Sequence, residues 1–160
     1  MRVFSATLLD ELAAQARQSP RRRAHHNIHA GPDDPVQRFL VAVQPDSYFR
    51  PHRHAARSEL AVVLRGCFDV LVFDASGHVT ARHRVGAGGS GFAYETPRGA
   101  WHTLVPGADG GCFLEVKEGP YDPATATEFA AWAPAEGTPG AGAFSAWLRG
   151  AQPGERPARS

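Results

Sequence analysis

Apolar positions in the first part of this chain follow a helical period. Between residues 5 and 18 they recur three and four residues apart, the spacing of one helix face. Thr7 and Asp10 have the spacing of a capping box, and Pro20 should end the helix because the residue before a proline avoids the helical region. This predicts an amphipathic helix over 5–18 that covers a face or an open edge of a sheet. The apolar stripe consists of Leu8, Leu9, Leu12, Ala13 and Ala16.

After this helix the apolar positions form short runs separated by turn residues. Runs of about six residues, divided by Gly, Pro and Asp, are typical of a sandwich or barrel. Arg65-Gly66 lies between two such runs and is interpreted as a hairpin turn, and 106–111 is interpreted as a loop. The predicted fold is therefore all-β. The predicted strands are 36–43, 48–54, 60–64, 67–73, 78–85, 92–95 and 112–117.

The C-terminal part alternates between apolar anchors and turn residues. Residues 125–132 predict one or two helical turns, and residues 149–160 have nothing to bury, so we expect that tail to be unstructured. The expected segments are a helix in 1–20, a barrel in 21–118 and an extension in 119–148. The anchors that would pack on the outside of the barrel are Phe129, Trp132, Phe144, Trp147 and Leu148.

Composition narrows the class of protein. A chain of 160 residues with 42% apolar content is most simply one globular domain. Its net charge of +1 gives no bulk electrostatic reason to expect nucleic acid or an acidic membrane as a partner. The 17 glycines and 13 prolines favour strands and turns over long helices.

The chain has neither a secretory signal pattern nor an apolar run of about 18 residues, the length that a membrane span needs. Cys67 and Cys112 both lie in apolar runs, where small buried side chains are the usual interpretation. We therefore expect a cytoplasmic protein.

Two histidines that flank an arginine are the strongest chemical signal. In a strand, side chains alternate, so His52 and His54 would face the same way, about 7 Å apart. Glu59 follows, and two imidazoles with a carboxylate form half of a metal site. The best candidate for the missing ligand is His102, which a Pro97-Arg-Gly99 turn would aim toward the same space.

Other polar residues in or near strands leave alternatives open. Tyr48 and Arg50 share the parity of the two histidines, which predicts a polar cavity. Asn27 and His29 would line that cavity or lie on the surface, with equal weight. Arg38 is either an ion-pair partner at a rim or an anion-binding group at the cavity mouth.

Glu115 lies inside an apolar strand beside Lys117. It is either the buried partner of a cation or an acid–base group near the metal. The Arg21-Arg22-Arg23 run is too short for a nucleic-acid patch and is interpreted as a solvated turn.

Together, these segments resemble the paired motifs of the cupin family. The first motif, H-x-H followed by E and G, is matched by His52, His54, Glu59 and Gly66, with Asp46 where the family has a leading glycine. The second is matched by Gly91, Pro97, Gly99 and His102, with Pro106 where the family has an asparagine. The resemblance implies a single-domain double-stranded β-helix, or jelly-roll barrel. It also implies one divalent transition metal (Fe, Mn, Ni, Co, Cu or Zn) on His52, His54, Glu59 and His102.

A narrower resemblance covers about residues 1–148. Asn27-x-His29, Gln37-Arg38-Phe39 and Glu115-Val-Lys-Glu-Gly-Pro-Tyr-Asp-Pro123 look like segments of the WbuC-type cupin-fold metalloproteins. That family occurs among bacterial surface-polysaccharide genes, and its reaction is unassigned. A homodimer is expected by resemblance to cupins.

The leading hypothesis is an enzyme, an isomerase or epimerase, that acts on a small molecule, with sugars and polysaccharide precursors as the candidates. A dioxygenase and a non-catalytic metal- or ligand-binding module are the alternatives. The candidate catalytic residues are Glu115 and Tyr48. The candidate substrate-binding residues are Asn27, His29, Arg38, Arg50, Lys117 and Tyr121.

Overall fold

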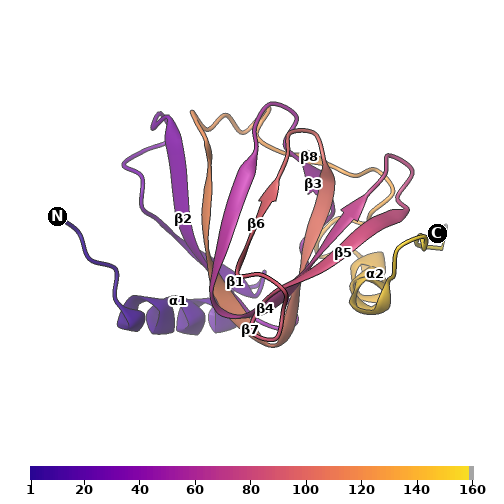
Figure 1. The fold of residues 1–160 in the computed structure, drawn as a ribbon, viewed down its shortest axis with the longest axis horizontal. Helices are drawn as coiled ribbons and strands as arrows, with labels where there is room; N and C mark the ends of the chain where they lie inside the picture. Colours follow the sequence, from indigo (N-terminus) through magenta and orange to yellow (C-terminus); the bar gives the residue numbers. More distant parts are fainter. Residues whose placement is uncertain (159–160) are drawn as a thin grey trace.

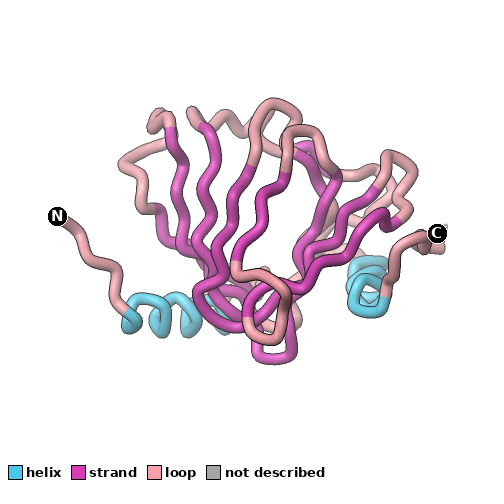
Figure 2. Tube along the Cα trace, in the orientation of Figure 1, coloured by secondary structure: helices cyan, strands magenta, loops and turns pink. Residues whose placement is uncertain are grey.

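The computed structural model describes residues 1–158, which form two β-sheets with a helix on the outside of each (Figure 1). The sheets diverge from a common bend, and loops gather at their open end (Figure 2). The elements are α1 (Ala6–Gln18), β1 (Arg23–Asn27), β2 (Val36–Val43), β3 (His52–Arg53), β4 (Glu59–Phe73), β5 (Val79–Gly86), β6 (Ala93–Thr96), β7 (Trp101–Glu118), β8 (Glu128–Phe129) and α2 (Pro139–Gly150).

The two longest strands belong to both sheets. The second half of β7 pairs with β2 and the first half of β4, which extends one sheet from β1 to β6. The first half of β7 pairs with β3 and the second half of β4, which extends the other sheet from β8 to β5. All of these pairings are antiparallel. Two sheets joined by shared, bent strands form the jelly-roll barrel expected from the sequence.

Three apolar layers follow from the alternation of side chains in these strands. Leu40, Ala42 and Cys112 face outward and pack under α1. Val41 and Phe113, one residue away, face inward and fill the closed end of the barrel. On the outside of the second sheet, Leu71, Phe73 and Val105 pack with the C-terminal residues Ala130, Ala133, Phe144 and Leu148.

Several expected elements differ in the structure. Ser5, not Thr7, caps α1, since its hydroxyl accepts a hydrogen bond from the Leu8 amide. Residues 125–132 form turns and the short β8 instead of a helix. Of the expected unstructured tail, the described residues 149–158 lie against β5 through hydrogen bonds of Val79 with Gly154 and Glu155, and residues 159–160 lie outside the described residues.

The predicted hairpin at Arg65-Gly66 and the predicted loop at 106–111 are both wrong. β4 and β7 run through these positions, and only the pairing register shifts there. Gly66 has φ +74°, a conformation that glycine adopts without strain. A left-handed glycine therefore marks a bulge at which the strand bends between sheets, instead of a turn.

Gly66→Ala tests this bend. A Cβ at Gly66 would lie 2.1 Å from the Gly110 carbonyl oxygen, so alanine adds a backbone clash to the cost of a left-handed conformation. We expect a loss of about 2–4 kcal/mol in the free energy of unfolding, measured with urea. Gly88→Ala is the matched control, because Gly88 has the same φ with nothing within 4 Å, and it should cost only about 1–2 kcal/mol. Equal losses would mean that the close approach to Gly110 does not constrain β4.

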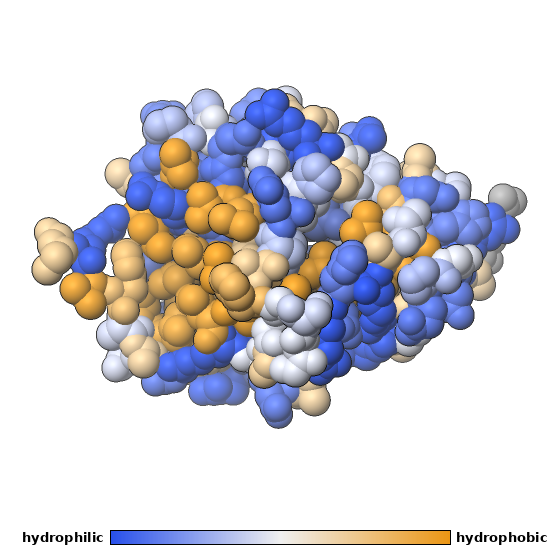
Figure 3. Space-filling model, viewed as in Figure 1, coloured by the Kyte–Doolittle hydropathy of each residue, from blue (hydrophilic) through white to orange (hydrophobic). Residues whose placement is uncertain are grey.

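The outer face of the first sheet carries exposed apolar side chains. Leu60 and Leu64 of β4 are 42% and 44% exposed, and Phe92, just before β6, is 72% exposed. Hydrophobic side chains gather in Figure 3 on the half of the molecule where Figure 1 draws β2, β4 and β6.

No helix in residues 1–158 is long and apolar enough to cross a membrane.

Candidate metal centre and adjoining cavity

Three imidazoles meet inside the barrel, as the sequence predicts. His52 on β3 pairs in register with His102 on β7, so the two strands hold their rings 4.5 Å apart. His54 follows β3 and joins them, and the ligand nitrogens of all three rings lie within 4.8 Å of one another. Glu59, at the start of β4, reaches the same space, with its carboxylate 3.1 Å from His54 Nε2 and 3.9 Å from His102 Nε2.

The hydrogen bonds of the three rings favour metal binding through Nε2. Nδ1 of His52, His54 and His102 each faces a backbone carbonyl, those of Arg50, Ala126 and Ala100, at 2.6–3.0 Å. Because a carbonyl only accepts, Nδ1 carries the proton, so Nε2 is the nitrogen that each ring, when neutral, offers to a metal. Carbonyl contacts of this kind fix the ligand tautomer in metal sites.

Two nitrogen atoms of this cluster lack a suitable partner, and a bound cation would be one. His102 Nε2 is buried, and no donor or acceptor in the described part of the chain contacts it. His54 Nε2 faces a carboxylate while its Nδ1 faces a carbonyl, so this ring needs a second proton or a cation between Nε2 and Glu59. The residues therefore fit a divalent metal bound by three neutral imidazoles and one carboxylate.

Burial sets the charge state of the donors. Loss of water lowers the pKa of His52 to about 3, with the neighbouring His102 as the next contribution, and burial likewise lowers the pKa of His102. Burial alone would raise the pKa of Glu59, but the hydrogen bond to His54 and the charge of Lys117 outweigh it, so the pKa falls below its ordinary value. The donor set at neutral pH thus includes two neutral imidazoles and an ionised carboxylate.

Glu115 and Lys117 connect this cluster to an open cavity. The Lys117 ammonium lies 2.6 Å from the Glu115 carboxylate and 3.4 Å from Glu59. Burial and the negative charge of Glu59 raise the pKa of Glu115. Both proposed roles of Glu115, cation partner and acid–base group, are compatible with this placement.

The cavity has a volume of about 700 Å³ and is formed by the inward faces of β1, β2 and β7. Of the predicted substrate-binding residues, it brings together Asn27, His29, Lys117 and Tyr121. His29 Nδ1 lies 3.0 Å from the Arg38 amide nitrogen and 2.9 Å from the Arg38 carbonyl oxygen, and these contacts hold the ring at the cavity wall. A cavity of this size is typical of sites for small molecules.

Three predicted site residues lie elsewhere. Tyr48 donates to the Pro134 carbonyl and packs on Phe144, on the outside of the second sheet. Arg50 donates to the Ala130 carbonyl, with its guanidinium over the Phe129 ring. Arg38 pairs with Asp34 and alternates with the inward-facing Gln37 and Phe39, so it is on the outer face of β2. The placements of Tyr48 and Arg50 correct the prediction of one shared polar face, because residues 48–51 are not a strand. For Arg38, the pair with Asp34 agrees with the expectation of an ion-pair partner and not with that of an anion-binding group at the cavity mouth.

Tyr94 was not predicted as a site residue. The strand register places it in one row with Ala61 and Glu115, on the inner face of β6. Burial and the charges of Glu59 and Glu115 raise its pKa well above the ordinary value, so its hydroxyl stays protonated. No short stretch of sequence indicates this position, which depends on the register of three strands.

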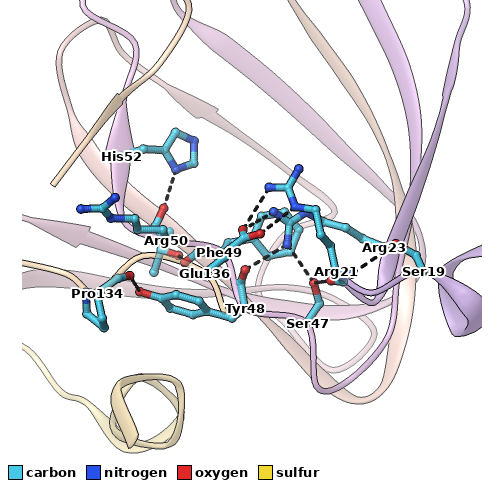
Figure 4. Close-up of polar contacts among 11 residues, drawn as sticks. Ser19, Arg21, Arg23, Ser47, Tyr48, Phe49, Arg50, His52, Pro134 and Glu136 are labelled. Carbon is cyan, nitrogen blue, oxygen red and sulfur yellow. Dashed lines mark hydrogen bonds and ion pairs between the residues drawn. The ribbon is translucent and has the colours of Figure 1, made fainter. Parts of the chain in front are cut away.

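Two arginines, Arg21 and Arg23, line the cavity away from the acid–base pair, and both bind the carboxylate of Glu136. Arg21 binds the Glu136 carboxylate through two hydrogen bonds of 2.6 and 3.0 Å, and Arg23 binds the same carboxylate (Figure 4). This cluster connects the C-terminal extension to the start of β1. The Arg21–Arg23 run is thus partly ordered by an ion pair, where the sequence predicted a solvated turn.

The Glu136 pairing should make stability depend on pH. Burial raises the pKa of Glu136, but hydrogen bonds from Arg21 and Arg23 overcome this and lower it below the ordinary carboxyl value. The lowered pKa means that the pair stabilises the fold above the ordinary carboxyl pKa and loses this effect as pH falls through the folded value. We expect Glu136→Gln to cost about 1 kcal/mol at pH 7 and much less near pH 3, measured by urea unfolding. A cost that does not change with pH would contradict the ionic role of Glu136.

Comparisons with known proteins agree with this fold. A family model described as a domain of unknown function, DUF6016, matches residues 4–85, which is half of the chain. No curated protein matches the chain. Among solved structures, an uncharacterised conserved protein with a double-stranded β-helix domain from Klebsiella pneumoniae is similar, with 18% identity over 81% of this chain and 97% of that one, and a TM-score of 0.57.

Two further similar structures are of named proteins. KdgF from Halomonas sp. is 17% identical over 65% of this chain and 84% of its own, with a TM-score of 0.50. Oxalate oxidase in complex with glycolate is 18% identical over 69% of this chain, with a TM-score of 0.52, and the match covers 56% of its length. These similarities confirm the single-domain cupin fold, which is a double-stranded β-helix.

Proposed function

The chain belongs to the family described as a domain of unknown function, DUF6016, and we propose that it is a metal-dependent enzyme for a small hydroxylated molecule. The observation that carries this proposal is the convergence of three imidazoles, with the Glu59 carboxylate beside two of them and Nε2 of His102 without a partner among the described residues. The metal centre lies beside a cavity that carries an acid–base pair. A binding site with a titratable group next to it is the arrangement expected of an enzyme.

Isomerisation or epimerisation is the reaction class that these residues support best. A divalent metal, when bound, would polarise a carbonyl or hydroxyl oxygen of the ligand. Glu115 would remove a proton from a neighbouring carbon and return it, since its raised pKa suits both steps. Lys117 would hold Glu115 in place, and the Tyr94 hydroxyl would donate a hydrogen bond to a ligand oxygen. This proposal needs no oxidant.

The finer expectations from the sequence belong to this proposal. WbuC-type character and a role with a polysaccharide precursor would make the ligand sugar-like, and the glycolate bound to oxalate oxidase adds hydroxy acids to the molecules to be tested. A cytoplasmic homodimer stays a prediction, and the exposed Leu60, Leu64 and Phe92 offer one apolar face for pairing.

Elemental analysis of protein purified without added metal tests the first half of the proposal. We expect about one equivalent of a first-row metal per chain. Nucleotide sugars and small hydroxy acids are then screened for metal-dependent conversion, with oxygen consumption followed in parallel. Conversion that consumes oxygen would favour a dioxygenase, and binding without conversion would favour a non-catalytic module. Protein that takes up no metal would reject the site.

A further inference from the structure

Arg21 and Arg23 line the far end of the cavity and hold one carboxylate, that of Glu136. Arg23 is held from three sides: its guanidinium donates to Ser47 Oγ at 3.2 Å and the Tyr48 carbonyl at 2.9 Å, and lies over the Phe49 ring at 4.4 Å. Its side chain is only 13% exposed. Arg21 is 60% exposed and presents its guanidinium edge to the same carboxylate. A held guanidinium keeps its geometry for bidentate contact with an oxyanion.

The charges of this cluster do not balance. Two guanidinium groups face one carboxylate, that of Glu136, which leaves one positive charge without a partner in the cluster. His25 lies beside them on β1, and burial together with the charges of Arg21 and Arg23 lowers its pKa, so it adds no further positive charge. A phosphate monoester carries about two negative charges at neutral pH and would balance both arginines.

The position of the cluster fits a ligand that reaches the metal centre. Arg23 and Asn27 are four residues apart on β1, about 13 Å along the strand. Asn27 pairs with Phe39 on β2, and Phe39 pairs with Glu115 on β7, so Asn27 is at the end of the cavity that carries the acid–base pair. The arginines are therefore at the opposite end of the same cavity. A phosphorylated sugar-like molecule has an anionic end and a hydroxylated end, and a nucleotide sugar has the length to span both.

We propose that Arg21 and Arg23 form the phosphate-binding subsite of this cavity, and that Glu136 occupies it until a ligand's phosphate displaces its carboxylate. The inference rests on the proposed function in taking the cavity as the substrate site. It narrows the substrate to phosphorylated, hydroxylated small molecules. Glu136 then acts as an internal competitor, carried by the C-terminal extension.

Titration of the full-length protein with inorganic phosphate and with pyrophosphate, by calorimetry at fixed ionic strength, tests this subsite. Removing the competing charge in Glu136→Gln should tighten the binding of both anions by about tenfold or more. Adding Arg21→Met to Glu136→Gln should abolish this gain, and Arg21 is exposed enough for the change to be tolerated. Arg23→Lys keeps the positive charge but loses the planar guanidinium with its paired donors. Added to Glu136→Gln, it should also reduce the gain in anion affinity.

Glu128→Gln is the matched control, because Glu128 pairs with Arg53 outside the cavity. It should leave phosphate affinity at the wild-type value. Glu136→Gln protein that binds the anions no tighter than wild type would overturn the subsite, as would binding that survives both arginine changes. A His102→Ala variant should lose metal and keep the anion affinity, so failure of the subsite and failure of the metal centre are separate results.

Discussion

Replacing His54 with alanine is expected to lower bound metal from about one equivalent per chain to below about one tenth. Loss of a group that only orients a metal ligand already costs about 10–100-fold in affinity, so loss of a direct ligand should cost more. His54 is 4% exposed, and its Nε2 lies 3.1 Å from Glu59, so no water-exposed group can take its place without rearrangement. Elemental analysis of the purified variant measures the result.

The same change should leave the barrel folded. It removes the donor to the buried Ala126 carbonyl, which costs about 1–3 kcal/mol, less than the typical stability of a domain. His83→Ala is the matched control, because His83 is exposed on β5, and it should keep the full metal content. A folded His54→Ala protein with one equivalent of metal would show that the ion binds elsewhere.

The metal centre was predictable because its signals are local. His52 and His54 are two residues apart, and the Pro97-Arg-Gly99 turn stands directly before the strand that carries His102. Each short segment fixes the direction of its own ligands. The parity argument failed for Tyr48 and Arg50 because β3 contains only His52 and Arg53, and alternation does not extend beyond a strand.

The bends of β4 and β7 could not be distinguished from turns by the sequence. Gly66 and Gly110 both have positive φ, which serves a hairpin turn and a β-bulge equally well. The choice between them depends on whether the flanking residues find partners in two different sheets. Those partners come from the long register between β4 and β7, which no short window contains.

The Arg21–Arg23–Glu136 cluster had no local signal, since Glu136 lies 115 residues from Arg21 and 113 residues from Arg23 along the chain. Tyr94 is a similar case. Its position between two carboxylates depends on the pairing of β6 with β4 and of β4 with β7. Sequence patterns predict which face of a strand a side chain occupies, and the topology decides which side chains from other strands it meets there.

Lys117→Met is expected to cause the largest loss of stability, about 3–5 kcal/mol in the free energy of unfolding. Lys117 is the shared cation of a buried carboxylate, Glu59, and a half-buried one, Glu115, whose side chains are 6% and 17% exposed. Methionine keeps much of the volume of the side chain but leaves two negative charges close together, one of them, on Glu59, away from water. Urea unfolding is measured on metal-free protein, because a metal on Glu59 would supply the charge that Lys117 provides.

A second change in the same group shows whether the loss is electrostatic. Adding Glu115→Gln to Lys117→Met removes one of the two uncompensated charges, so the double variant should be more stable than Lys117→Met alone. Arg98→Met is the matched control, because its pair with Glu118 is exposed at 63% and 45%, and it should cost less than about 1 kcal/mol. If Lys117→Met cost no more than Arg98→Met, the link between the metal centre and Glu115 would not hold, and Glu115 would have no charged neighbour to keep it in place for proton transfer.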